Sequence, residues 1–246
     1  MADAGAIPAE LLDALRETRH VCILTGAGIS AESGVPTFRD AHSGLWARYR
    51  PEDLATTEAF LNDPALIWRW YRWRRRLVAS AQPNAGHQAL ARLAELVPRM
   101  TLITQNVDGL HQRAGAQDVI EFHGNLFVDR CFLEGCAVDC SHDTDVPICP
   151  GCGSKVRPGV VWFGEQIPAT ALNRSFTAAA DCDVFLSVGT SAVVQPAAGL
   201  IQIAREASAM TVEINPNPTD FADHVDFAIG ATAGTALTEL VDSLEV

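Results

Sequence analysis

Short apolar runs alternate along this chain with longer segments of helical periodicity. Strands are predicted over residues 21–25, 100–104, 119–122, 183–188 and 210–214. Helices are predicted over residues 1–16, 64–81, 87–96, 196–206 and 236–244. This alternation is typical of a doubly wound α/β fold, in which a parallel sheet is covered by helices on both faces.

Two segments interrupt the alternation. Residues 45–83 have a helical pattern and carry four of the five tryptophans and both tyrosines, whereas residues 126–156 are polar, turn-like and rich in cysteine. We expect residues 1–44, 84–125 and 157–246 to form the α/β domain. The two insertions are expected to form a smaller lobe, with a cleft between the lobes.

The composition narrows the classes of function. The chain has 246 residues, a net charge of −12 and a single lysine, Lys155. A surface that binds nucleic acid is not expected, because phosphate contacts require basic groups. The N-terminus lacks the pattern of a signal peptide, and no apolar run is long enough to span a membrane. We therefore expect a cytoplasmic protein whose cysteines are reduced.

A glycine turn follows the first predicted strand. Gly26, Ala27, Gly28 and Ala31 fit the pattern G-x-G-x-x-G/A. Such a turn, between a strand and a helix, holds the pyrophosphate of a dinucleotide in doubly wound domains. The polar residues that come next, from Glu32 onward, are not part of an ordinary dehydrogenase fingerprint.

Five of the seven cysteines lie between residues 131 and 152. Four thiolates around Zn²⁺ form a closed, structural site, and such a site can hold together a segment that lacks its own core. Cys149 and Cys152 make one pair, and Cys131 and Cys136 make the first choice for the other. Cys140 could replace Cys136, and a redox role for the C-x-x-C pair is the alternative to zinc. Two further cysteines, at positions 22 and 182, are expected to be core thiols.

Polar side chains follow two of the predicted strands. Gln105, Asn106 and Asp108 come after the strand at 100–104, where ligands bind in sheets of this type. His123 follows the next strand and is suited to proton transfer near neutral pH. Helix capping by Asn106 or Asp108 and a structural role for His123 are the alternatives. His111 is a weaker candidate at a helix start that is expected to be exposed.

The run from Arg157 to Glu165 is extended and apolar at its centre. A free edge there could pair with a peptide by strand addition. The alternative is an ordinary β-strand that pairs within the protein. The periodicity of the sequence does not distinguish the two.

Taken together and in order, these motifs resemble the sirtuin family. The resemblance runs from about residue 21 to residue 244. The motifs that carry it are 26–39, 105–108, His123-Gly124, the paired cysteines, 161–165, 189–191 and Asn215.

The resemblance implies a NAD-dependent protein-lysine deacylase with a Rossmann-like domain and a small lobe that combines a helical and a zinc module. It implies that NAD is consumed: the acyl oxygen attacks the nicotinamide ribose, nicotinamide leaves, and His123 acts as general base on a ribose hydroxyl. The products would be free lysine, nicotinamide and O-acyl-ADP-ribose. By resemblance, NAD would be bound by Gly26, Ala27, Gly28, Ser30, Glu32, Phe38, Arg39, Trp46, Gln105, Asn106, Asp108, Gly189, Thr190, Ser191, Asn215 and Ala233.

The resemblance also indicates which acyl group is removed. Tyr71 and Arg74 are three residues apart, so they share a helix face, and a phenol with a guanidinium suits a carboxylate. A Tyr-x-x-Arg pair in this place is similar to the class III sirtuins, which act on succinyl- and malonyl-lysine. Ala55 would leave room for the longer group, and Val161 and Phe163 would border the acyl-lysine tunnel. A solvated basic helix face is the alternative.

One departure from the family pattern concerns zinc. The family's first cysteine pair has two intervening residues, whereas Cys131 and Cys136 enclose four. The expected ligands are therefore Cys131, Cys149 and Cys152, with Cys136 or Cys140 as the fourth.

Three other functions remain as alternatives. A mono-ADP-ribosyltransferase could use the same site, and a zinc-ribbon nucleic-acid module is disfavoured by the acidic charge. A NAD-dependent oxidoreductase would need an acidic residue at the end of a second strand, and Glu52 and Asp53 do not follow one. We expect a monomer whose partners are proteins that carry acylated lysines.

Overall fold

The computed structural model describes residues 7–36 and 49–245. Its main sheet is parallel, with the strand order β3-β2-β1-β6-β7-β8, and a separate antiparallel pair is formed by β4 and β5. The strands are β1 (Val21–Thr25), β2 (Met100–Thr104), β3 (Ile120–Glu121), β4 (Gly124–Cys131), β5 (Val156–Val160), β6 (Val184–Val188), β7 (Met210–Ile214) and β8 (Phe227–Ile229).

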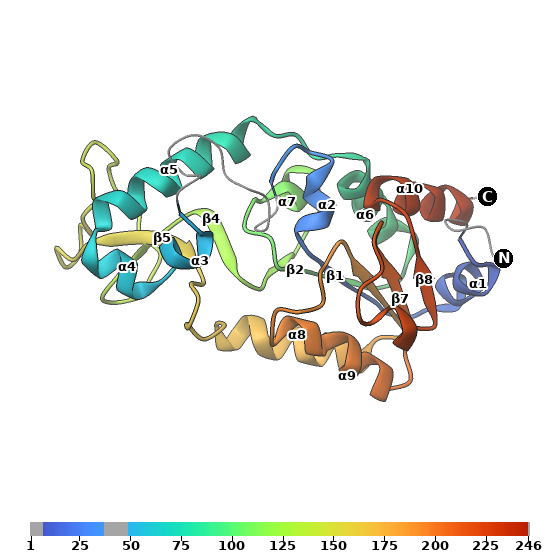
Figure 1. The fold of residues 1–246 in the computed structure, drawn as a ribbon. Helices are drawn as coiled ribbons and strands as arrows, with labels where there is room; N and C mark the ends of the chain where they lie inside the picture. Colours follow the sequence, from blue (N-terminus) through green and yellow to red (C-terminus); the bar gives the residue numbers. More distant parts are fainter. Residues whose placement is uncertain (1–6, 37–48, 246) are drawn as a thin grey trace.

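Helices cover both faces of the main sheet, as the alternation predicts (Figure 1). The helices are α1 (Ala9–Glu17), α2 (Ala27–Ala31), α3 (Pro51–Leu54), α4 (Thr57–Asn62), α5 (Pro64–Ser80), α6 (Ala85–Leu96), α7 (Leu110–Arg113), α8 (Ala169–Asp181), α9 (Leu200–Glu206) and α10 (Ala233–Leu244), with short 3-10 turns at Ala197–Gly199 and Ala222–His224.

The two faces of β1 show why this sheet is covered twice. Val21 and Ile23 pack into the core beneath α1, α6 and α10, whereas Cys22 and Leu24 pack into the core beneath α8 and α9. Successive side chains of a strand point to opposite faces, so a strand that is apolar throughout must be buried on both sides.

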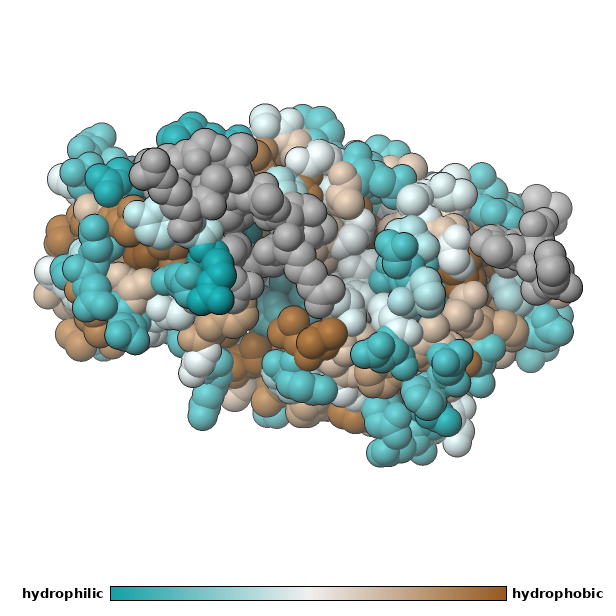
Figure 2. All heavy atoms as spheres, viewed as in Figure 1, coloured by the Kyte–Doolittle hydropathy of each residue, from teal (hydrophilic) through white to brown (hydrophobic). Residues whose placement is uncertain are grey.

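A second core lies at the other end of the molecule, where α4, α5, β4 and β5 lie together (Figure 1). It contains the buried rings of Phe60, Trp68, Trp70, Tyr71 and Trp162. Both insertions contribute to it, since Cys131 and Cys149 belong to the same cluster. On the face seen in Figure 2, hydrophobic residues reach the surface over this end, around α4 and β5.

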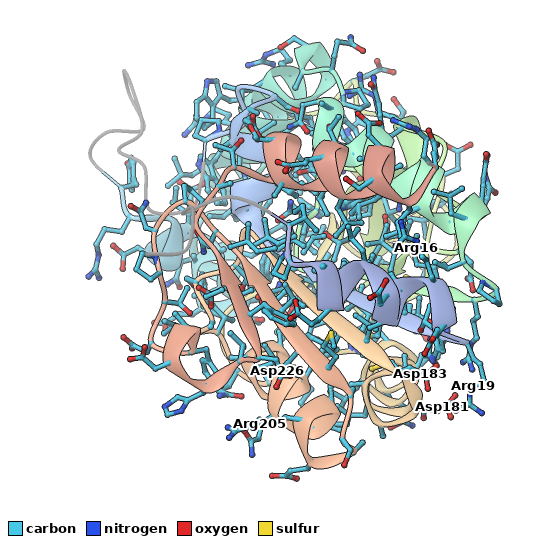
Figure 3. The ribbon with its side chains drawn as sticks, turned by 90° about the vertical axis from the view of Figure 1, so that its right-hand side faces the viewer. Arg16, Arg19, Asp181, Asp183, Arg205 and Asp226 are labelled. Atoms are coloured by element: carbon cyan, nitrogen blue, oxygen red, sulfur yellow. The ribbon has the colours of Figure 1, made fainter. Side chains whose placement is uncertain are left out.

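The amino-terminal edge of the sheet is held by Asp183, which comes directly before β6. Its Oδ2 accepts hydrogen bonds from the backbone amides of Arg19, at 2.8 Å, and His20, at 3.0 Å. Figure 3 shows Arg19, Asp181 and Asp183 close together at this edge. The bonds lower the pKa of Asp183, chiefly through the Arg19 amide. The predicted strand at 183–188 therefore starts one residue later, because Asp183 is used as an anchor.

Several sequence predictions of elements need correction. Helix α8 and strands β4 and β8 were not predicted, and the segment at 126–156 is not turn-like throughout, because β4 continues to Cys131. Helix α6 begins at Ala85 rather than His87, since Asn84 caps it in a box with His87. Helix α10 begins at Ala233 because Thr232 caps it. No helix of the described residues is both long and apolar enough to cross a membrane.

Candidate functional site

The loops after β1 and β6 meet so closely that only glycine fits. A Cβ atom at Gly28 would lie 2.7 Å from the backbone of Gly189, and one at Gly26 would lie 2.8 Å from the same residue's carbonyl oxygen. Gly28 donates its N–H to the carbonyl oxygen of Gly189, at 2.8 Å. Gly189 itself has a φ of +59°. This bare backbone at the carboxyl ends of β1 and β6 is a cradle that an extended phosphate chain could enter.

A polar cluster lies beside the cradle. The Oγ of Ser30 donates to the Asp108 carboxylate, with 2.7 Å between the oxygens. The side-chain amide of Asn106 donates to Ser30 Oγ and to the carbonyl oxygen of Gly26, both at 3.0 Å. The structure thus brings together Ser30, Asn106 and Asp108, although Ser30 precedes the others by more than 70 residues in the chain.

The next residues along the sheet edge extend this cluster. Gln105 donates its side-chain amide to Thr190 Oγ1, at 2.9 Å, and Asn215 donates to the carbonyl oxygen of Thr190, at 2.9 Å. Ser191 follows Thr190, where the chain leaves β6. Ala27 opens α2 at the cradle. These residues line the carboxyl edge from β2 to β7.

Glu32 and Ala233 lie at a different place from the cradle. Glu32 accepts hydrogen bonds from the amide of Gly234, at 2.8 Å, and from the Thr232 hydroxyl, at 3.1 Å. Its carboxylate therefore caps α10. Ala233 is buried in the first turn of that helix. The positions of Phe38, Arg39 and Trp46 lie outside the described residues.

His123 is half-buried at the start of β4. Its Nδ1 is 3.0 Å from the carbonyl oxygen of Gln105, and this contact fixes Nδ1 as the donor in the neutral ring. Nε2 is then free to accept a proton. Burial lowers the pKa of His123, so the neutral form predominates at neutral pH. Gly124 follows with a φ of +79°, and a Cβ atom there would lie 2.2 Å from the carbonyl oxygen of Gly159.

His111 is a correction. It was expected to be exposed at a helix start, but it is 1% exposed and its ring centroid lies 4.9 Å from that of His87. Burial lowers the pKa values of His111 and His87 to about 3 and about 4, so both rings are neutral at neutral pH. Nε2 of His111 is 2.9 Å from Thr25 Oγ1. His87 Nε2 is 3.5 Å from Ser30 Oγ, so the His87–His111 pair contacts the polar cluster through Ser30.

The residues expected to recognise the acyl group lie around the second core. Tyr71 is buried, and burial raises its pKa to about 12. The indole N–H of Trp162 donates to the Tyr71 oxygen at 2.9 Å. The guanidinium of Arg74 lies 5.9 Å from the centre of the Tyr71 ring. Desolvation lowers the pKa of Arg74, while the electrostatic interactions with Tyr71 and Asp108 raise it. The guanidinium therefore interacts with the carboxylate of the polar cluster.

Backbone hydrogen bonds connect the other residues expected near the acyl group, which are Ala55, Val161 and Phe163. Phe163 donates its N–H to the carbonyl oxygen of Ala55, at 2.9 Å, and the residue after Ala55 forms a bridge with Phe163. Val161 donates to the carbonyl oxygen of His123, at 2.8 Å. The segment from Val161 to Phe163 therefore links the His123 loop to the helical insertion. Sequence reasoning missed Trp162, whose only signal was its place in the run beside Val161.

Three of the expected zinc ligands come together. The sulfur atoms of Cys131, Cys149 and Cys152 all lie within 4.8 Å of one another, and those of Cys131 and Cys152 are 3.4 Å apart. The backbone amides of Cys152 and Gly151 lower the pKa of Cys149, which favours the thiolate. Sulfur atoms that share a tetrahedral zinc ion lie about 3.8 Å apart, so the group fits the metal.

Neither candidate for the fourth ligand joins this group. Cys136 is exposed, and its thiol stands outside it, although its carbonyl oxygen accepts a hydrogen bond from the amide of Cys131 at 2.9 Å. Cys140 lies beside Asp129 instead, with 3.7 Å between sulfur and oxygen.

Comparison with known proteins places this geometry in a family. The sequence model of the Sir2 family matches residues 26–196, and the chain belongs to that family. NAD-dependent protein deacylase 1 of Pseudomonas aeruginosa is 48% identical over 241 residues, which cover 94% of this chain and 96% of that protein. The NAD-dependent protein deacylase of Aquifex aeolicus is 47% identical and covers 93% of this chain and 96% of its own length. The crystal structure of a Sir2 homologue–NAD complex superposes with a TM-score of 0.92 at 44% identity, covering 100% of this chain and 96% of the other.

Proposed function

We propose that this chain removes acyl groups that end in a carboxylate, succinyl and malonyl among them, from the lysines of proteins, and that it also removes acetyl groups. The chain is a NAD-dependent protein deacylase of the Sir2 family. The observation that carries the finer proposal is the position of Tyr71 and Arg74 on one face of α5, beside Trp162.

The hydrogen bonding of Tyr71 suits a carboxylate ligand. Its oxygen already accepts from Trp162, and a pKa of about 12 keeps its own proton in place. The phenol can therefore donate to the acid end of an acyl group. Arg74, which is half-buried in the same region, supplies the positive charge that such a group needs, and a guanidinium can bind a carboxylate through two parallel bonds.

NAD fits the carboxyl edge of the main sheet, because the cradle formed by Gly26, Gly28 and Gly189 excludes side chains. When bound, NAD supplies the ADP-ribose that takes the acyl group as nicotinamide leaves. Gly26, Ala27 and Gly28 would hold the pyrophosphate. The other residues that would contact NAD are Ser30, Glu32, Phe38, Arg39, Trp46, Gln105, Asn106, Asp108, Gly189, Thr190, Ser191, Asn215 and Ala233.

His123 would act as the general base. Its Nδ1 is committed to the Gln105 carbonyl oxygen, so Nε2 would take the proton from a ribose hydroxyl. Asn106 and Asp108 would orient the ribose and the carboxamide. Ser30 supports them, since it bonds to both side chains.

The same proposal extends to the small lobe. Residues 45–83 and 126–156 would form this lobe, and residues 1–44, 84–125 and 157–246 the NAD-binding domain. Cys131, Cys149 and Cys152, with Cys136 or Cys140, would hold one structural Zn²⁺. The acylated lysine would pass between the lobes, where Ala55, Val161 and Phe163 lie. We further propose that the protein acts as a monomer in the cytoplasm.

A panel of acyl-lysine peptides tests this function. Each peptide carries the same sequence with acetyl, malonyl, succinyl or glutaryl on its lysine, and the nucleotide product is identified by mass spectrometry. We expect nicotinamide and O-acyl-ADP-ribose, with faster turnover of the acidic acyl groups than of acetyl. Transfer of ADP-ribose to a protein acceptor, or formation of NADH, would contradict the deacylase assignment, and preference for acetyl would contradict the acyl specificity.

A further inference from the structure

A second cluster of metal-ligating side chains lies in the cysteine-rich segment. It consists of Asp129 on β4 and of Cys140 and His142 in the loop that follows. The ligand atoms of these three residues all lie within 4.8 Å of one another, and none of the three belongs to the group around Cys131. The cluster thus combines a carboxylate from β4 with a thiol and an imidazole from the loop.

We propose that Asp129, Cys140 and His142 form a second site for a divalent transition metal, with Zn²⁺ as its ion, separate from the site of the structural zinc. Each of the three side chains is a ligand that zinc accepts. Three protein ligands leave the fourth tetrahedral position open to water, whereas a structural site is closed by four.

The distances in the cluster are close to those of a loaded site. At ordinary zinc bond lengths, a tetrahedral ion holds a carboxylate oxygen about 3.5 Å from a thiolate sulfur and about 3.3 Å from an imidazole nitrogen. Cys140 Sγ is 3.7 Å from Asp129 Oδ2. His142 Nε2 is 2.6 Å from the same oxygen, in a hydrogen bond. His142 would therefore retreat by less than about 1 Å, and it is free to do so because it is exposed.

Asp129 is held in the orientation that a ligand needs. Its side chain is only 10% exposed, and its other oxygen, Oδ1, accepts from Arg75 Nη2 at 2.7 Å. Arg75 is fixed in turn by a 2.7 Å bond to the carbonyl oxygen of Leu126. Oδ2 is thereby directed to Cys140 and His142. Outer hydrogen bonds of this kind orient metal ligands and commonly change affinity 10- to 100-fold when they are removed.

The loop is also supported from α5. The ring of His142 meets the edge of the buried Trp68 ring, with 5.3 Å between the centroids. Arg72 donates a hydrogen bond to the carbonyl oxygen of Thr144, two residues beyond His142. These two contacts hold this part of the loop against α5, while the imidazole itself stays partly exposed.

The surrounding charge favours a cation. Asp139, Asp143 and Asp145 flank the two loop ligands and are exposed, while Arg75 is the cation in direct contact with Asp129. Arg72 reaches the loop at Thr144, so the two guanidiniums of Arg72 and Arg75 stand against the four carboxylates of Asp129, Asp139, Asp143 and Asp145, and the excess of negative charge attracts a divalent ion.

Cobalt(II) binding tests the proposal, because a thiolate–cobalt bond gives a charge-transfer absorption that zinc does not mask. Protein purified with its own metal is titrated with Co²⁺, and zinc and cobalt are counted by mass spectrometry. We expect two ions per wild-type chain in total, one of them bound with a thiolate–cobalt absorption. His142→Ala should bind one ion and lose that absorption, and Cys140→Ser should do the same.

Two controls make the outcomes decisive. His224→Ala removes an exposed histidine on a different part of the fold and should still bind two ions. His142→Ala also removes the contacts of this side chain with Asp129 and Trp68, so its thermal unfolding without added metal is measured to show that the variant is folded at the temperature of the titration. The proposal is overturned if wild type binds one ion only, or if His142→Ala keeps the second. It is also overturned if Cys140→Ser binds no ion at all, since Cys140 would then be a ligand of the structural site.

Discussion

The indole Nε1 of Trp162 donates a hydrogen bond to the phenol oxygen of Tyr71, and the two atoms are 2.9 Å apart. The bond joins α5 to the segment that follows β5. Trp162 is itself fixed, because the guanidinium of Arg157 lies 3.4 Å from the centre of its ring and Glu165 accepts from its backbone amide at 2.8 Å. The Tyr71 oxygen is thus held in place as the acceptor of the Trp162 N–H. Its own hydroxyl proton remains to be donated, in a fixed direction, to a ligand.

Replacement of Tyr71 by phenylalanine tests that proton. Tyr71→Phe keeps the ring in the buried core and removes both the hydrogen bond to the acyl carboxylate and the oxygen that accepts from the Trp162 indole. A hydrogen bond to a charged group contributes about 1.5–3 kcal/mol, so kcat/KM for succinyl-lysine should fall at least about 10-fold. The value for acetyl-lysine should change by less than about 3-fold, since no charged partner is lost. Equal losses on both substrates would mean that the phenol serves the fold and not the ligand.

The pH dependence of catalysis tests His123. Because burial lowers its pKa below the usual value of 6.5, the base form is already present at neutral pH. We expect kcat/KM to be level near pH 7 and to fall as the pH drops through that lowered pKa. His123→Ala should reduce turnover at least about 100-fold, the usual contribution of a general base, while NAD still binds. Measured binding of NAD by calorimetry separates loss of catalysis from loss of the site, and substantial residual turnover would refute the role.

Asp183 predicts a measurable effect on stability. Its folded-state pKa is lowered, so its contribution is present above the unfolded pKa and is lost as the pH falls through the folded value. Asp183→Ala removes the anchor for the Arg19 and His20 amides and should lower the free energy of unfolding by about 2 kcal/mol at pH 7. The loss should shrink below pH 4, where the wild-type carboxyl becomes protonated.

Denaturant unfolding of Asp183→Ala at several pH values measures this effect. Asp118→Ala is the matched control, because Asp118 makes an ion pair with Arg174 but its side chain is 81% exposed. An exposed pair contributes at most about 1 kcal/mol. A similar loss in both variants would contradict the anchoring role of Asp183.

Removal of metal should affect one end of the molecule. The group of Cys131, Cys149 and Cys152 ties β4 to the segment before β5, so a chelator should increase amide hydrogen exchange in both strands. Exchange in β1 and β6 should stay slow, since their core contains none of these cysteines. Unchanged exchange in β4 after zinc has left would show that the metal does not hold this segment.

The sequence predicts β1, β2, β6 and β7 of the main sheet because each carries large apolar side chains within a short run, although β7 alternates them with Thr211 and Glu213. Residues 21–25, 100–104 and 210–214 are strands with the predicted bounds. The strand β4 escaped prediction because exposed and buried positions do not alternate regularly along it, and its pairing with β5 contains a register shift. Helix α8 has a weak signal, since its buried face is made of Ser175, Ala178 and Ala179 rather than large apolar residues.

The site shows the same limit. Motif residues such as Gly26, Asn106 and His123 can be found in sequence, because the chemistry requires those residue types at strand ends. The residues that hold these side chains in place cannot be found in sequence, because a tertiary contact leaves no local sequence pattern. Trp162 forms a hydrogen bond with Tyr71, 91 positions away in the chain. His111 is buried against His87, and its local sequence gives no sign of that contact.

The exchange of Arg74 for methionine tests the account most directly. The variant keeps the length of the side chain along α5 and removes its charge, and Arg76→Met, an exposed arginine on the same helix, is the control. The quantity to measure is kcat/KM for succinyl-lysine divided by that for acetyl-lysine, on peptides of one sequence. Arg74→Met should lower this ratio at least about 100-fold, since the charge that pairs with the acyl carboxylate in a partly desolvated site is lost, and Arg76→Met should leave it unchanged. An unaltered ratio in Arg74→Met would contradict the claim that this deacylase recognises the acid end of its acyl group.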